Sequence, residues 1–154
     1  MTYVVTLDTV IAQPIAAVRE RCAIKDIPTV WRPALDQVWA YLRAHEGVWP
    51  PGGRNLFLYH HPTQRDQPME IDFGVEVARH FDDGGAVRYV ETPVGQVAKT
   101  LHVGPYTGLP QAHMAVHQWC TQNGKQIGAH SWETYTDWNA DERKLETEVF
   151  YLLR

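Results

Sequence analysis

The order of motifs in the first half of the sequence returns in the second half, and this repetition limits the folds open to the chain. In each half, a strand-like run is followed by a helical pattern and then by two runs that alternate between apolar and polar residues. Pro14 and Pro93, which precede the first run of each half, are 79 residues apart. We therefore predict two copies of one strand–helix–strand–strand unit, over about residues 3–78 and 86–154, within a single domain.

Hydrophobic periodicity defines the elements of each unit. The predicted strands are 4–12, 15–22, 56–61, 69–77, 94–103, 132–137 and 145–153, and the predicted helices are 34–45 and 111–123. We expect strand 4–12 to pair with 15–22, 56–61 to form an antiparallel pair with 69–77, and 132–137 to form a closing hairpin with 145–153. Residues 49–53 are expected to form a loop. The predicted fold class is α+β, with a curved, mostly antiparallel sheet and two helices related by an approximate twofold.

Alternation along the strands assigns side chains to the two faces of the sheet, because successive strand residues point in opposite directions. The residues expected to pack against the helices are Leu56, Leu58, Ile71, Phe73, Val75, Val77, Trp132, Thr134, Thr136, Val149, Tyr151 and Leu153. The opposite face would then collect Phe57, Tyr59, Glu133, Tyr135 and Phe150. In a twisted sheet this face can become a groove where the two halves meet.

Glu133 stands out on this face, because glutamate is depleted in strands and is rarely buried without a partner. Aromatic rings offer a cation roughly 0.5–2 kcal/mol of attraction per contact. A carboxylate among them adds a charge partner that uncharged compounds cannot use. The pattern is typical of a groove for a flat, lipophilic cation. The alternative is a solvated Glu133 on an exposed sheet face.

Composition and charge restrict the class of protein. Of 154 residues, 44% are apolar and 21% charged, as in soluble globular proteins. A formal net charge of −4 argues against nonspecific nucleic-acid binding, which requires a basic surface. Cys22 and Cys120 lack metal-binding or redox spacing, and no signal peptide or membrane-spanning run is apparent. We expect a cytoplasmic protein with no cofactor and no membrane association.

Several segments resemble the GyrI-like effector-binding domains, which form the C-terminal sensors of many AraC-type and multidrug-binding MerR-type regulators and also occur alone. These segments are V-E-T-P-V-G-Q-V-A-K-T-L-H-V-G-P-Y-T-G-L, W-C-T-Q-N-G, S-W-E-T-Y-T-D-W and T-E-V-F-Y-L-L. The resemblance covers nearly the whole chain. It implies a duplicated strand–helix–strand–strand fold, which agrees with the repeat.

The resemblance also implies roles for individual residues. In the family's multidrug sensors, a glutamate on the penultimate strand contacts cationic aromatic drugs, and Glu133 stands at the matching position. Tyr135 matches a pocket-lining position of the same strand. Tyr106 matches a frequent residue at the mouth of the second helix, and Trp39 would line the corresponding edge of the first. For Tyr106 and Trp39, core packing is the alternative interpretation.

Three functions are consistent with the resemblance. The first is a stand-alone, non-enzymatic domain that binds lipophilic, cationic aromatic compounds. The second is a hydrolase of strained cyclopropane rings in DNA-alkylating natural products, with Glu133 as general base and its pKa raised by a hydrophobic pocket. The third is a gyrase-inhibitor-like protein that acts by protein–protein contact.

The family's regulators place a DNA-binding helix-turn-helix region before the sensor, whereas the predicted strands of this chain begin at about residue 3. We therefore expect no direct DNA binding. Regulation of transcription would then require a protein partner, such as a separate regulator. Contact with gyrase and assembly into a homodimer are the other macromolecular partnerships that we consider.

Histidines offer a second chemical signal, which we interpret as structural. His113 and His117 lie four residues apart on a predicted helix, a spacing that suits a metal-binding pair. The segment H-M-A-V-H lacks the glutamate of H-E-x-x-H and an obvious third ligand, so we predict a surface pair and no metal site. His60 and His61 would face opposite sides of a strand and cannot chelate together.

Overall fold

A computed structural model describes residues 2–48, 53–64, 66–83, 85–136 and 138–154. Its strands are β1 (Thr6–Val10), β2 (Pro14–Cys22), β3 (Asn55–His60), β4 (Met69–Glu76), β5 (Arg88–Glu91), β6 (Gly95–Val103), β7 (Ile127–Tyr135) and β8 (Glu146–Leu153). The helices are α1 (Ile27–Ala44) and α2 (Leu109–Gln122), with short 3-10 turns η1 (Ile24–Asp26), η2 (Tyr106–Gly108) and η3 (Glu142–Lys144). The predicted α+β class is confirmed.

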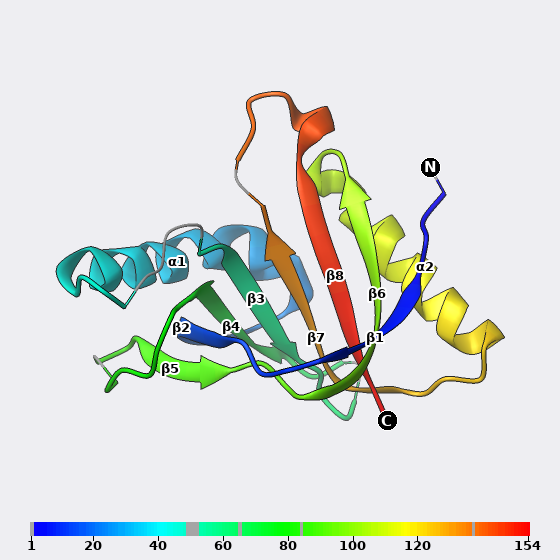
Figure 1. Ribbon diagram of the computed structural model, residues 1–154, viewed down its shortest axis with the longest axis horizontal. Helices are drawn as coiled ribbons and strands as arrows, with labels where there is room; N and C mark the ends of the chain where they lie inside the picture. Colours follow the sequence, from blue (N-terminus) through cyan, green and yellow to red (C-terminus); the bar gives the residue numbers. More distant parts are fainter. Residues whose placement is uncertain (1, 49–52, 65, 84, 137) are drawn as a thin grey trace.

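The strand order displays the predicted duplication. The sheet runs β1-β6-β8-β7-β3-β4-β2-β5, and all neighbouring strands are antiparallel. One unit is β2-α1-β3-β4, the other is β6-α2-β7-β8, and β3 and β7 meet at the centre. α1 packs mainly on β2 and β4 and α2 on β6 and β8, one helix in each half of the molecule (Figure 1). Neither helix therefore packs mainly on the two central strands, β3 and β7.

The predicted pairing of the first two strands is wrong. β1 pairs with β6, while β2 pairs with β4 and β5. The linker between β1 and β2 does not fold back into a hairpin. Instead, the Gln13 N–H donates to Thr92 Oγ1 at 2.8 Å, and the Thr92 N–H donates to the Gln13 carbonyl at 3.0 Å. These two hydrogen bonds tie the β1–β2 connection to the β5–β6 connection. As a result, β1, which precedes the first unit, pairs with β6 of the second unit, and β5, which precedes the second unit, pairs with β2 of the first.

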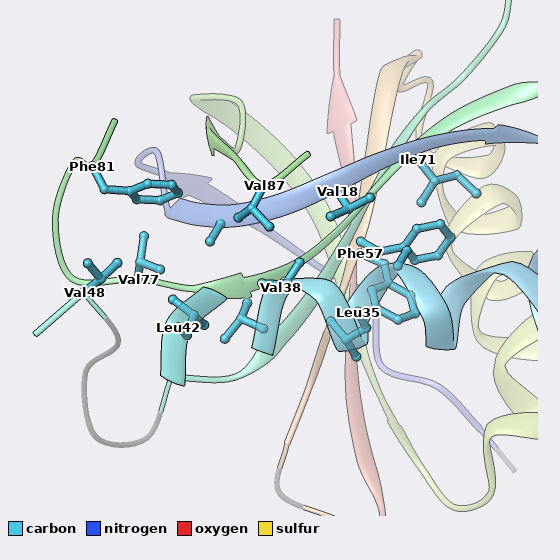
Figure 2. Packing of buried hydrophobic residues seen from close by; sticks show 14 of the residues in the cluster. Val18, Leu35, Val38, Leu42, Val48, Phe57, Ile71, Val77, Phe81 and Val87 are labelled. Carbon is cyan, nitrogen blue, oxygen red and sulfur yellow. The ribbon is translucent and has the colours of Figure 1, made fainter. Parts of the chain in front are cut away.

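α1 begins at Ile27, well before the predicted start at residue 34. Pro28 fits the first turn, where a missing N–H removes no intrahelical bond. Pro33 lies inside the helix, where it does remove one. Figure 2 shows the apolar stripe of α1, with Leu35 and Val38 labelled, packed on the strands. Burial of this stripe keeps the helix in place despite the proline.

Other boundaries also differ from the prediction. β7 begins at Ile127 rather than 132, and its pairing with β8 is irregular between Ile127 and Ser131. The short strand β5 was not predicted, because its four residues carry too little alternation to stand out. Apart from residue 53, the loop predicted at 49–53 lies outside the described residues.

The predicted faces are correct for β4 and β8 and wrong for β3 and β7. Phe57 lies opposite Phe73 in the β3–β4 pair, and both belong to the core under α1. Glu133 lies opposite both Phe57 and Val149, and Val149 packs under α2. The helical face therefore carries Phe57, Tyr59, Glu133 and Tyr135. A separate cluster on the other face contains Ile15, Ala17, Leu56, Leu58, Val97, Trp132 and Phe150.

The physical reason for this error is that β3 and β7 are central strands, buried on both faces. Leu56, Phe57 and Leu58 are consecutive and all buried. Alternation between apolar and polar residues identifies the inner face only when the other face is solvated. In β3 both faces are apolar, so the period of two leaves the choice of face open.

β4 approaches β2 closely at Gly74, and we expect a larger residue there to strain the sheet. A Cβ at this position would lie 2.9 Å from the carbonyl oxygen of Ala16 and 3.1 Å from Cδ1 of Ile15. The backbone oxygen cannot rotate away. Gly74→Ala should lower the free energy of unfolding by about 1–3 kcal/mol, measured by urea denaturation. A change below about 0.5 kcal/mol would show that the two strands separate without strain.

Candidate functional site

A cavity of about 820 Å³ lies between α1 and α2, on the helical face of the central strands β3 and β7. The described residues that line it are Ile24, Ile27, Pro28, Trp31, Leu35, Asn55, Phe57, Tyr59, His61, Met69, Tyr106, Thr107, Leu109, Pro110, His113, Ser131, Glu133, Tyr135, Thr136, Trp138 and Tyr151. The cavity exists because each helix covers its own unit and leaves the junction of the two units open. Its size is that of a pocket for a drug-sized molecule.

An aromatic band crosses the cavity from one helix to the start of the other. The Trp31 ring of α1 lies 6.3 Å from the Phe57 ring, and the Phe57 ring lies 4.9 Å from that of Tyr135. The Tyr135 ring lies 5.6 Å from Tyr106, at an interplanar angle of 89°. These tilted and edge-to-face contacts are favourable geometries for aromatic pairs. They fix a continuous apolar wall on which further rings can pack.

Glu133 lies within this band and is only 5% exposed. Its Oε1 accepts hydrogen bonds from the hydroxyls of Tyr59 and Tyr135, both at 2.5 Å. Its Oε2 accepts a bond from Nε2 of His113 at 2.7 Å. Bonds of this length are typical of hydroxyl and imidazole donors to an ionised carboxylate. Three donors from β3, β7 and α2 thus hold one buried carboxylate in a fixed position.

These contacts keep Glu133 ionised. Burial by itself would raise the pKa of the carboxyl, but the hydrogen bond and charge of His113 and the bonds from Tyr135 and Tyr59 outweigh it, and the pKa is lowered. The expectation of a raised pKa is therefore wrong. Burial and the negative charge of Glu133 raise the pKa of Tyr59 and Tyr135 well above the ordinary value, so both hydroxyls remain donors.

A second set of polar side chains extends from His113 along the cavity wall. Nδ1 of His113 lies 2.7 Å from the Tyr151 hydroxyl, which is also hydrogen bonded to Ser131. Ser131 Oγ in turn lies 2.7 Å from Nε2 of His61. Burial, followed by the charges of neighbouring histidines, lowers the pKa of His61 to about 4, so His61 is neutral at neutral pH. Among the described residues of the cavity wall, Glu133 is the one aspartate or glutamate.

The structure brings most of the sequence-predicted site residues together. Glu133, Tyr135, Phe57, Tyr59 and Tyr106 all line the cavity, although on the helical face rather than the opposite one. This placement contradicts the predicted face but gathers the residues as predicted.

Two of the predicted residues lie elsewhere. Phe150 is on the far face, stacked on Trp132 with ring centroids 5.3 Å apart. Trp39 is not among the described residues of the cavity wall. Its Nε1 donates to Oδ1 of Asn55 at 3.1 Å, and Asn55 does line the cavity. Trp39 therefore supports a wall residue rather than forming the wall.

His113 was predicted to be a surface residue, and this prediction is wrong. Its side chain is 23% exposed and binds Glu133 directly. The helical spacing of His113 from buried apolar residues indicates that it lies on the inner face of α2. His113 lies four residues after Leu109 and three before Val116, two buried residues of the inner face of α2. His117 is exposed, and the described residues contain no group of three or more metal-binding side chains that could hold an ion.

The pseudo-twofold explains why two tyrosines meet at one carboxylate. In the β3–β7 pair Phe57 lies opposite Glu133, and Asn55 lies opposite Tyr135. Rotation about an axis through this pair relates Phe57 to Glu133 and Tyr59 to Tyr135. The two tyrosines are thus equivalent positions of the two units, and both donate to the same oxygen. At the centre of this pair the symmetry is broken, because one unit carries Phe57 and the other carries Glu133.

Comparison with known proteins agrees with this fold. Residues 4–154 match the GyrI-like small molecule binding domain family. The chain belongs to the GyrI-like family. Among curated proteins, none matches the sequence significantly.

Neither helix of the described residues has the length and apolar character needed to cross a bilayer.

Several solved structures share this fold at low sequence identity. The C-terminal domain of EcmrR superposes with a TM-score of 0.83 at 20% identity, over 100% of this chain and 99% of that domain. In the EcmrR–DNA complex, the match covers 99% of this chain and 57% of the EcmrR chain. SAV2435, solved bound to tetraphenylphosphonium, superposes with a TM-score of 0.73 at 16% identity, over 100% of this chain and 94% of that protein.

Proposed function

We propose that this GyrI-like domain binds lipophilic cations with several aromatic rings, and that Glu133 is their charge partner. The observation that carries the proposal is an ionised, buried carboxylate in an aromatic cavity without a lysine or arginine among its described wall residues. A buried negative charge favours a positive ligand, since the low-dielectric surroundings strengthen their attraction. The rings add cation–π contacts.

The shape of the cavity supports a ligand with more than one ring. Its volume of about 820 Å³ exceeds what a single ring fills, and the aromatic band extends along it from α1 to η2. Large apolar side chains are also exposed at lining positions, namely Ile24, Tyr106 and Trp138. A ligand that extends past the carboxylate would cover apolar surface that water now contacts. The tetraphenylphosphonium held by SAV2435 belongs to this chemical class.

The geometry favours a binding protein over a hydrolase. A general base works best when its pKa lies near the operating pH. The pKa of Glu133 is lowered, and three donors already occupy its oxygens. As a sensor, the domain would pass ligand occupancy to a protein partner.

Tryptophan fluorescence tests the location of the ligand. Rhodamine 6G, a permanent aromatic cation, should quench the wild type saturably, and Trp31→Phe should lose a large part of this quenching because Trp31 lines the cavity. Trp119→Phe is the matched control, since Trp119 lies on α2 outside the described cavity wall. It should retain the ligand-dependent quenching. Equal losses in the two variants, or no saturable quenching of the wild type, would contradict the proposal.

A further inference from the structure

His113 gives the cavity a cationic group of its own, directly beside Glu133. Its Nε2 lies 2.7 Å from Glu133 Oε2 and its Nδ1 lies 2.7 Å from the Tyr151 hydroxyl. Among the described residues of the wall, only His113 and His61 can become positively charged, and His61 bonds Ser131 rather than the carboxylate. A buried charge is costly without a partner. The position of Nε2 allows His113 to act as that partner whenever both of its ring nitrogens carry protons.

The contacts of His113 accommodate two protonation states without movement of the ring. When both ring nitrogens carry protons, Nε2–H donates to Glu133 and Nδ1–H donates to the Tyr151 oxygen. When Nδ1 is bare, the Tyr151 hydroxyl can turn and donate to it, because a hydroxyl both donates and accepts. Nε2–H keeps its bond to Glu133 in both states. One proton can therefore leave His113 while the carboxylate stays in place.

We propose that a ligand cation enters this cavity in exchange for one proton from His113, so that binding releases a proton to solvent. The proposal rests on the function proposed above. A ligand cation and protonated His113 would share one carboxylate, and two like charges at a single buried site repel each other. Loss of the Nδ1 proton removes the repulsion and conserves charge, since one cation arrives and one proton leaves.

Other titratable groups face the His113–Glu133 pair from every neighbouring element. They are Tyr59 and His61 from the β3 side, Tyr135 from β7, Tyr151 from β8, His117 and Cys120 from α2, and Tyr106 from η2. The tyrosines and Cys120 have raised pKa values and keep their protons through neutral pH. The lowered pKa values of Glu133 and His61 keep both deprotonated above about pH 5. An experiment must therefore distinguish whether a released proton comes from His113 or from His117.

Calorimetric titration with tetraphenylphosphonium, which carries no exchangeable proton, tests the exchange. Titrations in two buffers of different ionisation heat, repeated from pH 5 to 8.5, count the protons released. The wild type should release about one proton per cation at the acidic end and none at the basic end. The Kd of the wild type for tetraphenylphosphonium should rise about tenfold for each unit by which the pH falls in the range where a proton is released. It should stay level at the higher pH values where no proton is released.

Two variants locate the proton. His113→Gln keeps an N–H donor for Glu133 but cannot be protonated, so its Kd should be independent of pH and its proton release should vanish. His117→Gln, one helical turn away and outside the described wall, should behave as the wild type. Proton-free, pH-independent binding by the wild type would overturn the exchange and leave the proposed function intact. Proton release that persists in His113→Gln would also overturn it. An absence of saturable binding at every pH would overturn both proposals.

Discussion

Glu133→Gln should weaken the binding of tetraphenylphosphonium about 100-fold, equivalent to about 2.7 kcal/mol, because it removes the charge partner and keeps the shape of the side chain. The remaining amide oxygen can still accept from Tyr59 and Tyr135, and His113 can adopt the other tautomer, so the cavity should persist. A neutral compound of similar shape, triphenylphosphine oxide, should bind the variant within about threefold of the wild type. Calorimetric titration of both ligands measures the difference.

Glu148→Gln is the matched control for this prediction. It makes the same charge change on the adjacent strand, opposite Thr134, and its side chain pairs with Arg54 at 3.5 Å outside the described cavity wall. We expect less than a twofold change in the affinity for the cation, since exposed charges are screened by solvent. Equal losses in the two glutamine variants would show that net charge, rather than the position of Glu133, attracts the ligand.

Asp72→Asn should lower the free energy of unfolding by about 2–3 kcal/mol, because the buried Asp72 joins three strands through an ion pair with Arg19 and a hydrogen bond from His60. Asp72 is 1% exposed, and its oxygens accept from Arg19 Nε at 2.8 Å and Arg19 Nη2 at 2.9 Å. His60 Nε2 donates to Oδ2 at 2.6 Å. Asparagine has the same volume, but its NH₂ group would face these donors. The expected loss lies below that for a fully buried pair, since Arg19 and His60 are partly solvated.

The pH dependence of this difference provides a second check. Burial opposes ionisation of Asp72, but the bonds from His60 and Arg19 outweigh burial and lower its pKa. A lowered pKa stabilises the fold above the pKa of an unfolded carboxyl, about 3.9, and this contribution is lost as pH falls through the lower folded value. The gap between wild type and Asp72→Asn in urea denaturation should therefore be present at pH 7 and shrink below about pH 4. Glu70→Gln, half-exposed and 3.8 Å from Arg19, should change stability by less than about 0.5 kcal/mol.

The order of the elements could be predicted because it depends on local patterns. Helical spacing at Leu35 and Val38, and alternation at Ile71 and Phe73, are visible over a few residues and led to the correct element types. The repeated order of those elements led to the duplicated fold. The pairing of β1 was not predictable in this way, because it depends on the contact between Gln13 and Thr92, which are 79 residues apart.

The candidate site divides in the same way. Glu133 and Tyr135 were predicted as site residues from a short motif and a family resemblance, and Tyr59 and Phe57 from alternation. His113 was missed because its helical spacing from His117 indicates a metal-binding or surface pair, whereas its partner is a carboxylate 20 residues away on β7. Phe150 was included because it alternates with the helix-facing residues of β8, and the structure places it against Trp132 instead.

The sequence by itself determined the repeated unit, the type of its elements and the presence of one carboxylate among aromatic residues. Only the tertiary structure decided which face those residues occupy and what Glu133 contacts. The physical reason is that central strands bury both faces, so the period of two cannot identify the side on which the helices pack. The cavity itself forms where two separately packed units meet. Its charge depends on donors from β3, β7 and α2, which only the folded chain brings to one carboxylate.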